Sequence, residues 1–363
     1  MSASNAPRHH AFASDNTAGI CPEAWAALAA TNRDYVASYG EDEVTTEARR
    51  SFNDLFETEC SVFFVFNGTA ANALALSACC RDPFTSILCH AISHLDTDEC
   101  GAPEFFTGGA KLIPLSGADG KLSPHEVERI LRREPNVHFP KPRVLSLTQS
   151  TEWATVYSRE EISALAQLAR THDLRVHMDG ARFANAVAAL AQRDSSASAL
   201  RALPADVTWR AGVDVLTLGG TKNGLLGTEA VVFFNRALAQ DFEYRVKQGG
   251  QLASKMRFAA AQWSALLRDG VWLKHAAHAN AQAKVLAEAL RPIPKIKLIR
   301  QPEVNAVFAE LAPAVYPALA ALGWRLNRFV GEHGYRLMCS WSTTAEDIDE
   351  LIADIRSVVT SIS

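Results

Sequence analysis

The sequence contains no run of about 20 consecutive apolar residues, the length that a membrane-spanning helix requires. Its apolar runs, among them 61–66 and 230–234, stop at the length of a β-strand. The first residues, MSASNAPRHHAF, contain no apolar core segment, so we expect no secretory signal and a cytoplasmic protein. Charge of one sign is not in excess either. The 36 basic and 40 acidic residues give a net charge of -4, and the composition does not indicate binding to nucleic acid.

Paired cysteines are also absent. The seven cysteines are odd in number and include no C-x-x-C pair, so we predict reduced, mostly buried thiols, with neither a disulfide framework nor a metal site. A nucleophilic cysteine is the alternative. We give it little weight, because free cysteine behaves mainly as a small hydrophobic residue.

The length of the chain, 363 residues, predicts about two domains at roughly 150 residues each. Residues 1–20 are polar and lack a sustained period, which indicates an N-terminal arm. In the following part of the chain, helical patterns cover 68–80, 158–172 and 179–193, and they alternate with apolar runs at 86–89, 111–114, 143–147 and 174–178. This alternation predicts an α/β domain over 21–250 that is built around a mainly parallel sheet.

A smaller unit is predicted over 251–363. A long amphipathic stretch, 251–290, is the expected connector out of the first domain. Short apolar segments follow, and then a final helix over 344–359. The start of that helix carries Thr344 with Asp347 three residues on, a shortened relative of the capping box. We therefore expect a compact C-terminal α+β domain.

The first candidate functional residue is Lys222, which follows an apolar strand in the glycine-rich segment LTLGGTKNGLLGTEAVVFF. The glycines let the backbone bend tightly and let a bulky ligand approach, and Thr221 places a hydroxyl beside the lysine. A lysine amine that is withdrawn from water is available to attack an aldehyde. The alternative is a solvated lysine in a surface turn, and this segment alone does not favour either interpretation.

The second candidate is Asp179 in LRVHMDGARFANA, at the end of a predicted strand and before a helix that begins near Ala181. A carboxylate at this end of a strand lies where α/β folds place their ligands, and it can keep a pyridine nitrogen protonated. The alternative is a helix N-cap, which is the more frequent role for such an aspartate. Arg182 would point toward the same site, where its guanidinium suits a carboxylate.

The third candidate is a phosphate cup in FVFNGTAANALAL, where a strand passes through residues 67–70 into a helix. Small residues at a helix N-terminus leave backbone N–H groups facing outward, and these bind phosphate. Many strand-to-helix turns are built from small residues, so this feature alone is a weak indication. The segment is neither a Walker loop nor a G-x-G-x-x-G motif.

Phosphate cup, strand-end aspartate and turn lysine, in this order, resemble the aspartate-aminotransferase-type fold (fold type I) of pyridoxal-phosphate enzymes. Within that fold the chain resembles the low-specificity L-threonine aldolases over nearly its full length. The segments that carry the resemblance are FASDNTAG at 12–19, YGEDEVT at 39–45, NGTAAN at 67–72, SHLDTDECGAPE at 93–104, NVHFPKPRVLSL at 136–147, HMDGARFANA at 177–186, GGTKNG at 219–224 and RLMCSW at 336–341.

This resemblance implies pyridoxal 5'-phosphate as cofactor. It also implies retro-aldol cleavage of L-threonine, L-allo-threonine and related β-hydroxy-α-amino acids such as phenylserine, which gives glycine and an aldehyde. Lys222 would hold the cofactor as a Schiff base, and Asp179 would pair with the ring nitrogen. The further cofactor-binding residues that it implies are Gly68, Thr69 and Ala70 at the phosphate, His94 on the ring face, Arg182 and Thr221.

The resemblance also implies residues for the substrate. Ser14, Arg182 and Arg336 would hold its carboxylate, and His138 would lie near its β-hydroxyl. Tyr39 and Asp42 belong to a loop that reaches the active site of a partner subunit in such enzymes. We therefore expect a homo-oligomer with shared active sites, either a dimer or a tetramer.

One loop departs from the family pattern. Many members have Glu-Asn-Thr-His-Asn after the strand RVLSL, whereas residues 148–152 of this chain are Thr-Gln-Ser-Thr-Glu. The general base is left open between His138, His94 and a water held by His94. The alternatives to an aldolase are a β-eliminating lyase or an aminotransferase on the same fold, or a binding or scaffold protein that has no cofactor.

Overall fold

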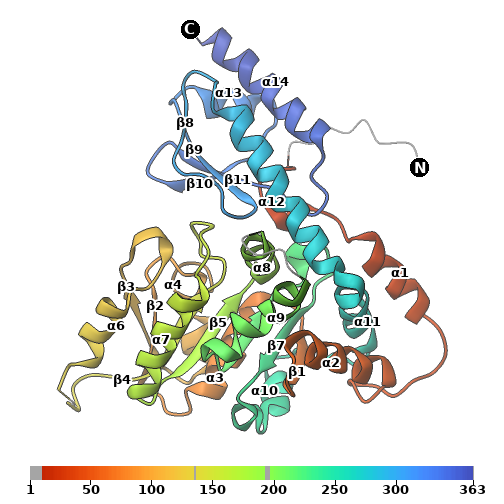
Figure 1. Ribbon diagram of the computed structural model, residues 1–363, viewed down its shortest axis with the longest axis vertical. Coiled ribbons are helices and arrows are strands. Elements are labelled where there is room, and N and C mark those ends of the chain that lie inside the picture. Colours follow the sequence, from red (N-terminus) through yellow and green to blue (C-terminus); the bar gives the residue numbers. More distant parts are fainter. Residues whose placement is uncertain (1–9, 135, 193–196, 363) are drawn as a thin grey trace.

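The computed structural model describes residues 10–134, 136–192 and 197–362, with 197–201 described by their backbone only. Two sheets organise this part of the chain (Figure 1). The large sheet contains β1 (Ser61–Val65), β2 (Thr85–His90), β3 (Lys111–Leu115), β4 (Lys141–Thr148), β5 (Arg175–Gly180), β6 (Val215–Leu218) and β7 (Glu229–Phe233). The small sheet contains β8 (Ile296–Leu298), β9 (Ala306–Leu311), β10 (Asn327–Val330) and β11 (Gly334–Met338).

The large sheet has the strand order β1-β7-β6-β5-β4-β2-β3. β7 pairs antiparallel with both of its neighbours, and the pairs among β6, β5, β4, β2 and β3 are all parallel. The small sheet is antiparallel in the order β10-β11-β9-β8. These topologies confirm the predicted mainly parallel α/β domain and the smaller α+β unit.

Fourteen α-helices surround the two sheets in the described residues. They are α1 (Pro22–Thr31), α2 (Glu43–Phe56), α3 (Gly68–Cys79), α4 (His94–Thr97), α5 (Ala102–Phe106), α6 (Pro124–Leu131), α7 (Arg159–Thr171), α8 (Phe183–Ala191), α9 (Ala197–Asp206), α10 (Phe242–Gln248), α11 (Arg257–Leu267), α12 (Val271–Leu290), α13 (Val315–Ala321) and α14 (Ala345–Ser361). Short 3-10 turns are η1 (Asp15–Thr17), η2 (Ala118–Gly120), η3 (Trp209–Ala211), η4 (Thr221–Asn223), η5 (Arg236–Ala239) and η6 (Arg268–Gly270).

The large sheet is apolar on both faces, which is why helices cover both. Successive strand residues point to opposite sides, so Ile87 and Val215 lie in one hydrophobic core while Leu88 and Leu216 lie in the other. Helix α3, which is buried along nearly its whole length, belongs to the first of these cores. Because neighbouring strands from β6 to β3 are parallel, their carboxyl ends lie at one edge of the sheet, and the candidate site lies at this edge.

A third core fills the small unit, which lies at one end of the molecule in Figure 1 with α12 extending into it. Phe12 of the N-terminal arm is fully buried there, with its ring centroid 6.1 Å from that of Trp324. The backbone carbonyl of Phe12 accepts a hydrogen bond from the amide of Met338 in β11. The predicted domain boundaries at residues 20 and 250 stay predictions.

One predicted boundary was wrong for a local reason. The helix after Asp179 begins at Phe183 instead of near Ala181, because β5 continues through Gly180 and Arg182 is the N-cap. The stretch 251–290 forms two helices, α11 and α12, because the chain turns at Asp269 and Gly270, whose φ angles are 53° and 68°. The capping box at the start of the final helix is confirmed.

All seven cysteines are free thiols, five of them buried, as predicted. Within the described residues, no helix is long and apolar enough to cross a membrane.

Candidate active site

A cavity of about 350 Å³ opens at the carboxyl ends of β5 and β6. It is lined by Asp179, Lys222, His94 and the first residues of α3. The three sequence features, which lie more than 100 residues apart at their extremes, therefore meet in one place. Parallel strands that end at a common edge bring them together.

Lys222 lies in the 3-10 turn η4, directly after β6. The two glycines before this turn are required by packing. A Cβ atom on Gly219 would lie 2.3 Å from the carbonyl oxygen of Ala181, and one on Gly220 would lie 2.5 Å from the carbonyl oxygen of Thr228. The predicted role of the glycines in a tight turn is thus confirmed. Thr221 lines the cavity beside the lysine.

Asp179 is buried at the end of β5, in register with Thr148 and Thr217 of the neighbouring strands. Its Oδ1 accepts a hydrogen bond from the amide of Ala181 at 2.9 Å, and its Oδ2 accepts one from Nδ2 of Asn72 at 3.0 Å. Asp179 is not the N-cap of α8, because that position belongs to Arg182. The helix-cap alternative is therefore wrong.

The helix start that was predicted to be a phosphate cup lies at the wall of the cavity. Gly68 and Thr69 line the cavity at the start of α3, where the first amides of a helix have no carbonyl partner within the helix. The amide of Ala70 instead donates to Oδ1 of the N-cap residue Asn67 at 2.8 Å, and Ala70 is not part of the cavity wall. A phosphate role for Ala70 stays a prediction, and its amide would have to leave Asn67 to bind a ligand.

His94, the first residue of α4, is held by a buried glutamate that the sequence analysis did not single out. Its Nδ1 lies 3.0 Å from Oε1 of Glu99, and that same oxygen accepts a hydrogen bond from Asn72 at 2.8 Å. The hydrogen bond with Glu99 raises the pKa of His94, while burial raises the pKa of Glu99. When Nδ1 faces Glu99, Nε2 is the nitrogen left for a ligand.

Asn72 connects this pair to Asp179. Its side-chain amide donates to both Glu99 and Asp179, and its carbonyl oxygen accepts a hydrogen bond from Thr217 at 2.7 Å. His94 and Asp179 therefore belong to one hydrogen-bond network, which runs through Glu99 and Asn72.

Arg182 is already paired. Its Nε and Nη2 donate to the two carboxylate oxygens of Asp15 at 2.7 and 2.9 Å, and both side chains are largely buried. Burial acts to raise the pKa of Asp15, but the Arg182 guanidinium outweighs it and holds this pKa below its usual value. Arg182, which was predicted to hold a substrate carboxylate, thus donates two parallel hydrogen bonds to Asp15 of its own chain.

Arg336 of β11, unlike Arg182, has a hydrogen-bond donor that no described residue binds. Its Nε is buried and has no hydrogen-bond partner among the described residues. Burial and the neighbouring charge of Arg182 lower the pKa of Arg336, while Asp15 and Glu152 act in the opposite direction. A buried guanidinium without a bonded carboxylate is a suitable place for an anionic ligand. Glu152, the last residue of the loop that departs from the family pattern, lines the cavity nearby.

None of the five predicted substrate residues is part of the cavity wall itself, and the three besides Arg182 and Arg336 have other contacts. Ser14 is the N-cap of η1, where its Oγ accepts a hydrogen bond from the amide of Asn16, and Asn16 rather than Ser14 lines the cavity. Asp42 is the buried N-cap of α2, where it accepts hydrogen bonds from the amide and hydroxyl of Thr45. Tyr39 is 47% exposed, with Nζ of Lys247 5.3 Å from its ring centroid.

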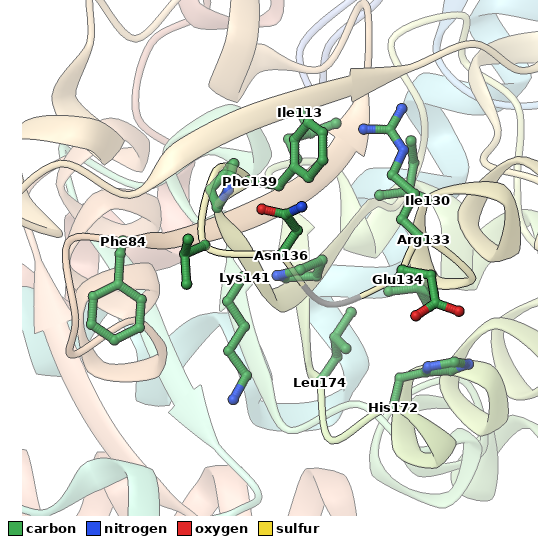
Figure 2. Close-up of a pocket in the computed structure, with 14 residues that line it drawn as sticks. Phe84, Ile113, Ile130, Arg133, Glu134, Asn136, Phe139, Lys141, His172 and Leu174 are labelled. Carbon is green, nitrogen blue, oxygen red and sulfur yellow. The ribbon is translucent and has the colours of Figure 1, made fainter.

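His138 lies at the opposite edge of the sheet. It precedes the first residue of β4, whereas Asp179 pairs with Thr148 at the last residue of that strand. At about 3.3 Å per residue, the two ends of β4 are roughly 23 Å apart. A separate cavity of about 640 Å³ lies at this edge, beside Lys141 (Figure 2). The expectation that His138 lies near a substrate bound at Lys222 is thus not met within one chain.

The residues that sequence reasoning missed are mostly acidic or amide side chains. They are Asp15, Asn72, Glu99 and Glu229. The first three lie inside the segments that carry the family resemblance, but a sequence alone does not show which polar residues turn inward. Glu229 had a visible signal, since it is a carboxylate that opens the apolar strand 229–233.

One group of possible metal ligands lies outside the cavity. The ligand atoms of Cys21, Glu23 and His275 all lie within 4.8 Å of one another. Tetrahedral zinc, with bonds of 2.0–2.3 Å, places its ligand atoms about 3.5 Å apart. The 3.0 Å contact between His275 and Glu23 is a hydrogen bond that joins α12 to α1, and we assign no metal to the group.

Comparison with known proteins identifies the family. The family model described as beta-eliminating lyase matches residues 11–314. The chain belongs to this family. It is 50% identical to the low specificity L-threonine aldolase of Pseudomonas aeruginosa, over 96% of this chain and 97% of that protein. It is 48% identical to the enzyme of the same name from a Pseudomonas species, over 96% and 98% of the two chains.

The fold agrees with this membership in the beta-eliminating lyase family. The solved structure of Leishmania major threonine aldolase superposes with a TM-score of 0.86 at 26% identity, and the match covers 96% of this chain and 99% of that one. The predicted fold type I architecture and the resemblance to L-threonine aldolases are confirmed.

Proposed function

We propose that this chain is a pyridoxal-phosphate-dependent low-specificity L-threonine aldolase. It cleaves L-threonine, L-allo-threonine and related β-hydroxy-α-amino acids to glycine and an aldehyde. The observation that carries the proposal is the single cavity in which Lys222, buried Asp179 and the N-terminus of α3 meet. The 50% identity to a Pseudomonas L-threonine aldolase over nearly the whole chain supports the substrate class.

The residues present fit pyridoxal phosphate group by group. The N-terminal amides of α3 at Gly68 and Thr69 suit its phosphate, buried Asp179 suits its ring nitrogen, and the amine of Lys222 suits its aldehyde. His94 would cover a face of the ring. When bound, this cofactor supplies an electron-accepting ring to the substrate's α-carbon.

Arg336 would orient the substrate by its carboxylate. The unpartnered Nε of Arg336 gives this guanidinium a free donor, whereas Arg182 is bonded to Asp15. Arg182 then acts as a positioning residue that holds the N-terminal arm beside the cavity. Fixing the carboxylate selects which bond at the α-carbon is aligned for cleavage.

His94 is the general base that the geometry favours. It lines the cavity, and Glu99 holds its Nδ1, so Nε2 is free to accept the proton of the substrate's β-hydroxyl. Removal of that proton accompanies cleavage of the bond between Cα and Cβ. The carbon–oxygen single bond of the hydroxyl becomes the double bond of the aldehyde, and the electron pair of the broken bond stays with the α-carbon. That carbon then takes up a proton, from the imidazole or from solvent, to give glycine.

We also propose a homo-oligomer, a dimer with shared active sites or a tetramer, and a cytoplasmic location. His138, Tyr39 and Asp42 lie outside the cavity of their own chain, so any part that they take in catalysis requires a second copy. Tyr39 and Phe139 are 47% and 56% exposed, as residues at a subunit interface would be in an isolated chain. Analytical ultracentrifugation of the purified protein tests the assembly.

The decisive test of the reaction is a product analysis. The purified protein with pyridoxal phosphate should convert L-threonine to glycine and acetaldehyde, and L-phenylserine to glycine and benzaldehyde. Pyruvate with ammonia would indicate β-elimination instead, and a keto acid would indicate transamination. Borohydride reduction followed by peptide mapping should label Lys222, and label on any other lysine would refute the cofactor assignment.

A further inference from the structure

Glu229 is a buried carboxylate that faces the turn carrying Lys222. It is the first residue of β7, only 7% of its surface is exposed, and it lines the cavity together with Lys222 and Asp179. Its Oε2 accepts a hydrogen bond from the amide of Gly220 at 2.5 Å, and the amide of Thr221 lies 3.4 Å from the same oxygen. These are the two amides immediately before Lys222.

Two features fix the backbone of this turn, namely the close packing at Gly220 and the hydrogen bonds to Glu229. Gly220 packs so tightly against the carbonyl of Thr228 that no side chain fits there, so the turn lies directly on the residue that precedes Glu229. The amides of Gly220 and Thr221 both point toward Glu229, and the hydrogen bond from Gly220 is buried. Buried amides require a partner, and one carboxylate oxygen of Glu229 serves both.

Burial raises the pKa of Glu229, while its hydrogen bonds with Thr221 and Gly220 and the charge of Lys222 act against this increase. Glu229 lines the same cavity as Lys222 and accepts hydrogen bonds from the two amides that precede the lysine. Loss of this acceptor would therefore loosen the backbone that carries Lys222, which indicates a part for Glu229 in presenting the lysine.

We propose that Glu229 is a positioning residue that fixes the Gly220–Thr221 backbone and thereby presents the Lys222 amine to the cavity. This inference rests on the proposed function, in which Lys222 bonds the cofactor, and it extends that function by naming what holds the lysine in place. Glu229 acts through the turn and does not itself contact the substrate.

The test compares two substitutions of Glu229 by hydrogen–deuterium exchange. Glu229→Met keeps approximately the volume and removes the acceptor, whereas Glu229→Gln keeps an acceptor oxygen. In the Met variant, exchange of the amides in a peptide that covers 218–225 should become faster, and in the Gln variant it should stay near the wild-type rate. Glu152→Met is the matched control, because it removes a second carboxylate from the same cavity wall without contacting the turn.

A second measurement follows the cofactor. The apoprotein of each variant is mixed with pyridoxal phosphate, and the rise of the visible absorbance of the bound cofactor is timed. Because small displacements of a reacting group slow reaction strongly, Glu229→Met should slow this rise by about tenfold or more. Glu229→Gln should restore the rate to within about threefold of wild type. In steady state, kcat for L-threonine should fall in the Met variant with KM little changed.

These results separate the inference from the function on which it rests. Wild-type exchange at 218–225 in Glu229→Met, or equal damage from Gln and Met, would overturn the positioning role even if the protein is an active aldolase. Failure of the wild-type protein to bind pyridoxal phosphate would overturn the proposed function, while the exchange experiment would still decide whether Glu229 anchors the turn.

Discussion

The buried ion pair between Asp15 and Arg182 gives the sharpest prediction for stability. Asp15→Asn removes the negative charge but keeps the shape of the side chain, and it leaves the guanidinium of Arg182 without its partner. Asp15 and Arg182 expose only 1% and 12% of their side chains. Removal of one partner from a buried pair costs about 3–5 kcal/mol, because the other charge stays buried and uncompensated.

We expect a loss near the lower end of that range, about 3 kcal/mol, because Arg182 keeps a small exposed surface and the charge of Glu152 lies nearby. A loss of 1 kcal/mol lowers the thermal midpoint of a large domain by about 2 °C, so the midpoint should fall by roughly 6 °C. Circular dichroism of the cofactor-bound protein at a fixed scan rate measures this change.

The pH dependence of this effect has a defined sign. The pKa of Asp15 is lower in the folded protein than its ordinary value of 3.8. The pair therefore stabilises the fold at pH values above that ordinary value, and its contribution is lost as the pH falls through the folded pKa. The difference between wild type and Asp15→Asn should stay constant from about pH 8 to about pH 5 and shrink only in stronger acid.

An exposed ion pair provides the control. Asp173, paired with Arg143, has 71% of its side chain exposed, and Asp173→Asn should leave the midpoint essentially unchanged. If Asp15→Asn lowers the midpoint no more than this control does, the buried pair does not hold the N-terminal arm, and the reasoning from burial is wrong.

Four predictions concern catalysis. Asp179→Asn should keep the cofactor but lower kcat by about 100-fold, because an amide does not stabilise the positive charge of a protonated ring nitrogen as a carboxylate does. The visible absorbance measures cofactor binding and steady-state turnover measures kcat. Unchanged turnover would contradict the role of Asp179. Arg336→Lys should raise KM for L-threonine by about tenfold through loss of a charge-assisted hydrogen bond, and an unchanged KM would place the substrate carboxylate elsewhere. His94→Phe should lower cleavage by about 100-fold. Glu99→Gln replaces the carboxylate whose hydrogen bond and charge raise the pKa of His94 with a neutral amide, so the acidic limb of the kcat profile should move to lower pH. A loss of the same size in His138→Phe, with normal cleavage in His94→Phe, would show that the base comes from a second copy of the chain.

The order of elements and several residues that line the cavity could be predicted because they have local signals. Apolar runs of strand length that alternate with helical patterns predict a parallel sheet, and the glycines around Lys222 mark a tight turn. The family resemblance then added the reaction. Residues such as Asp179 and Lys222 were found because their positions at strand ends follow from the chain itself.

The sequence by itself determined the fold class, the family and the residues at the ends of β5 and β6, since all of these follow from local pattern and motif. Only the tertiary structure decided which side chains are already bonded to one another. Arg182 was expected to bind the substrate, but its guanidinium is bonded to Asp15, which lies 167 residues away in the sequence. The Nε of Arg336 has no partner among the described residues. His138 was expected near the substrate, but β4 carries it to the far edge of the sheet. These contacts join segments that are distant in the sequence, and neither periodicity nor a motif shows which distant residues lie close together in the fold.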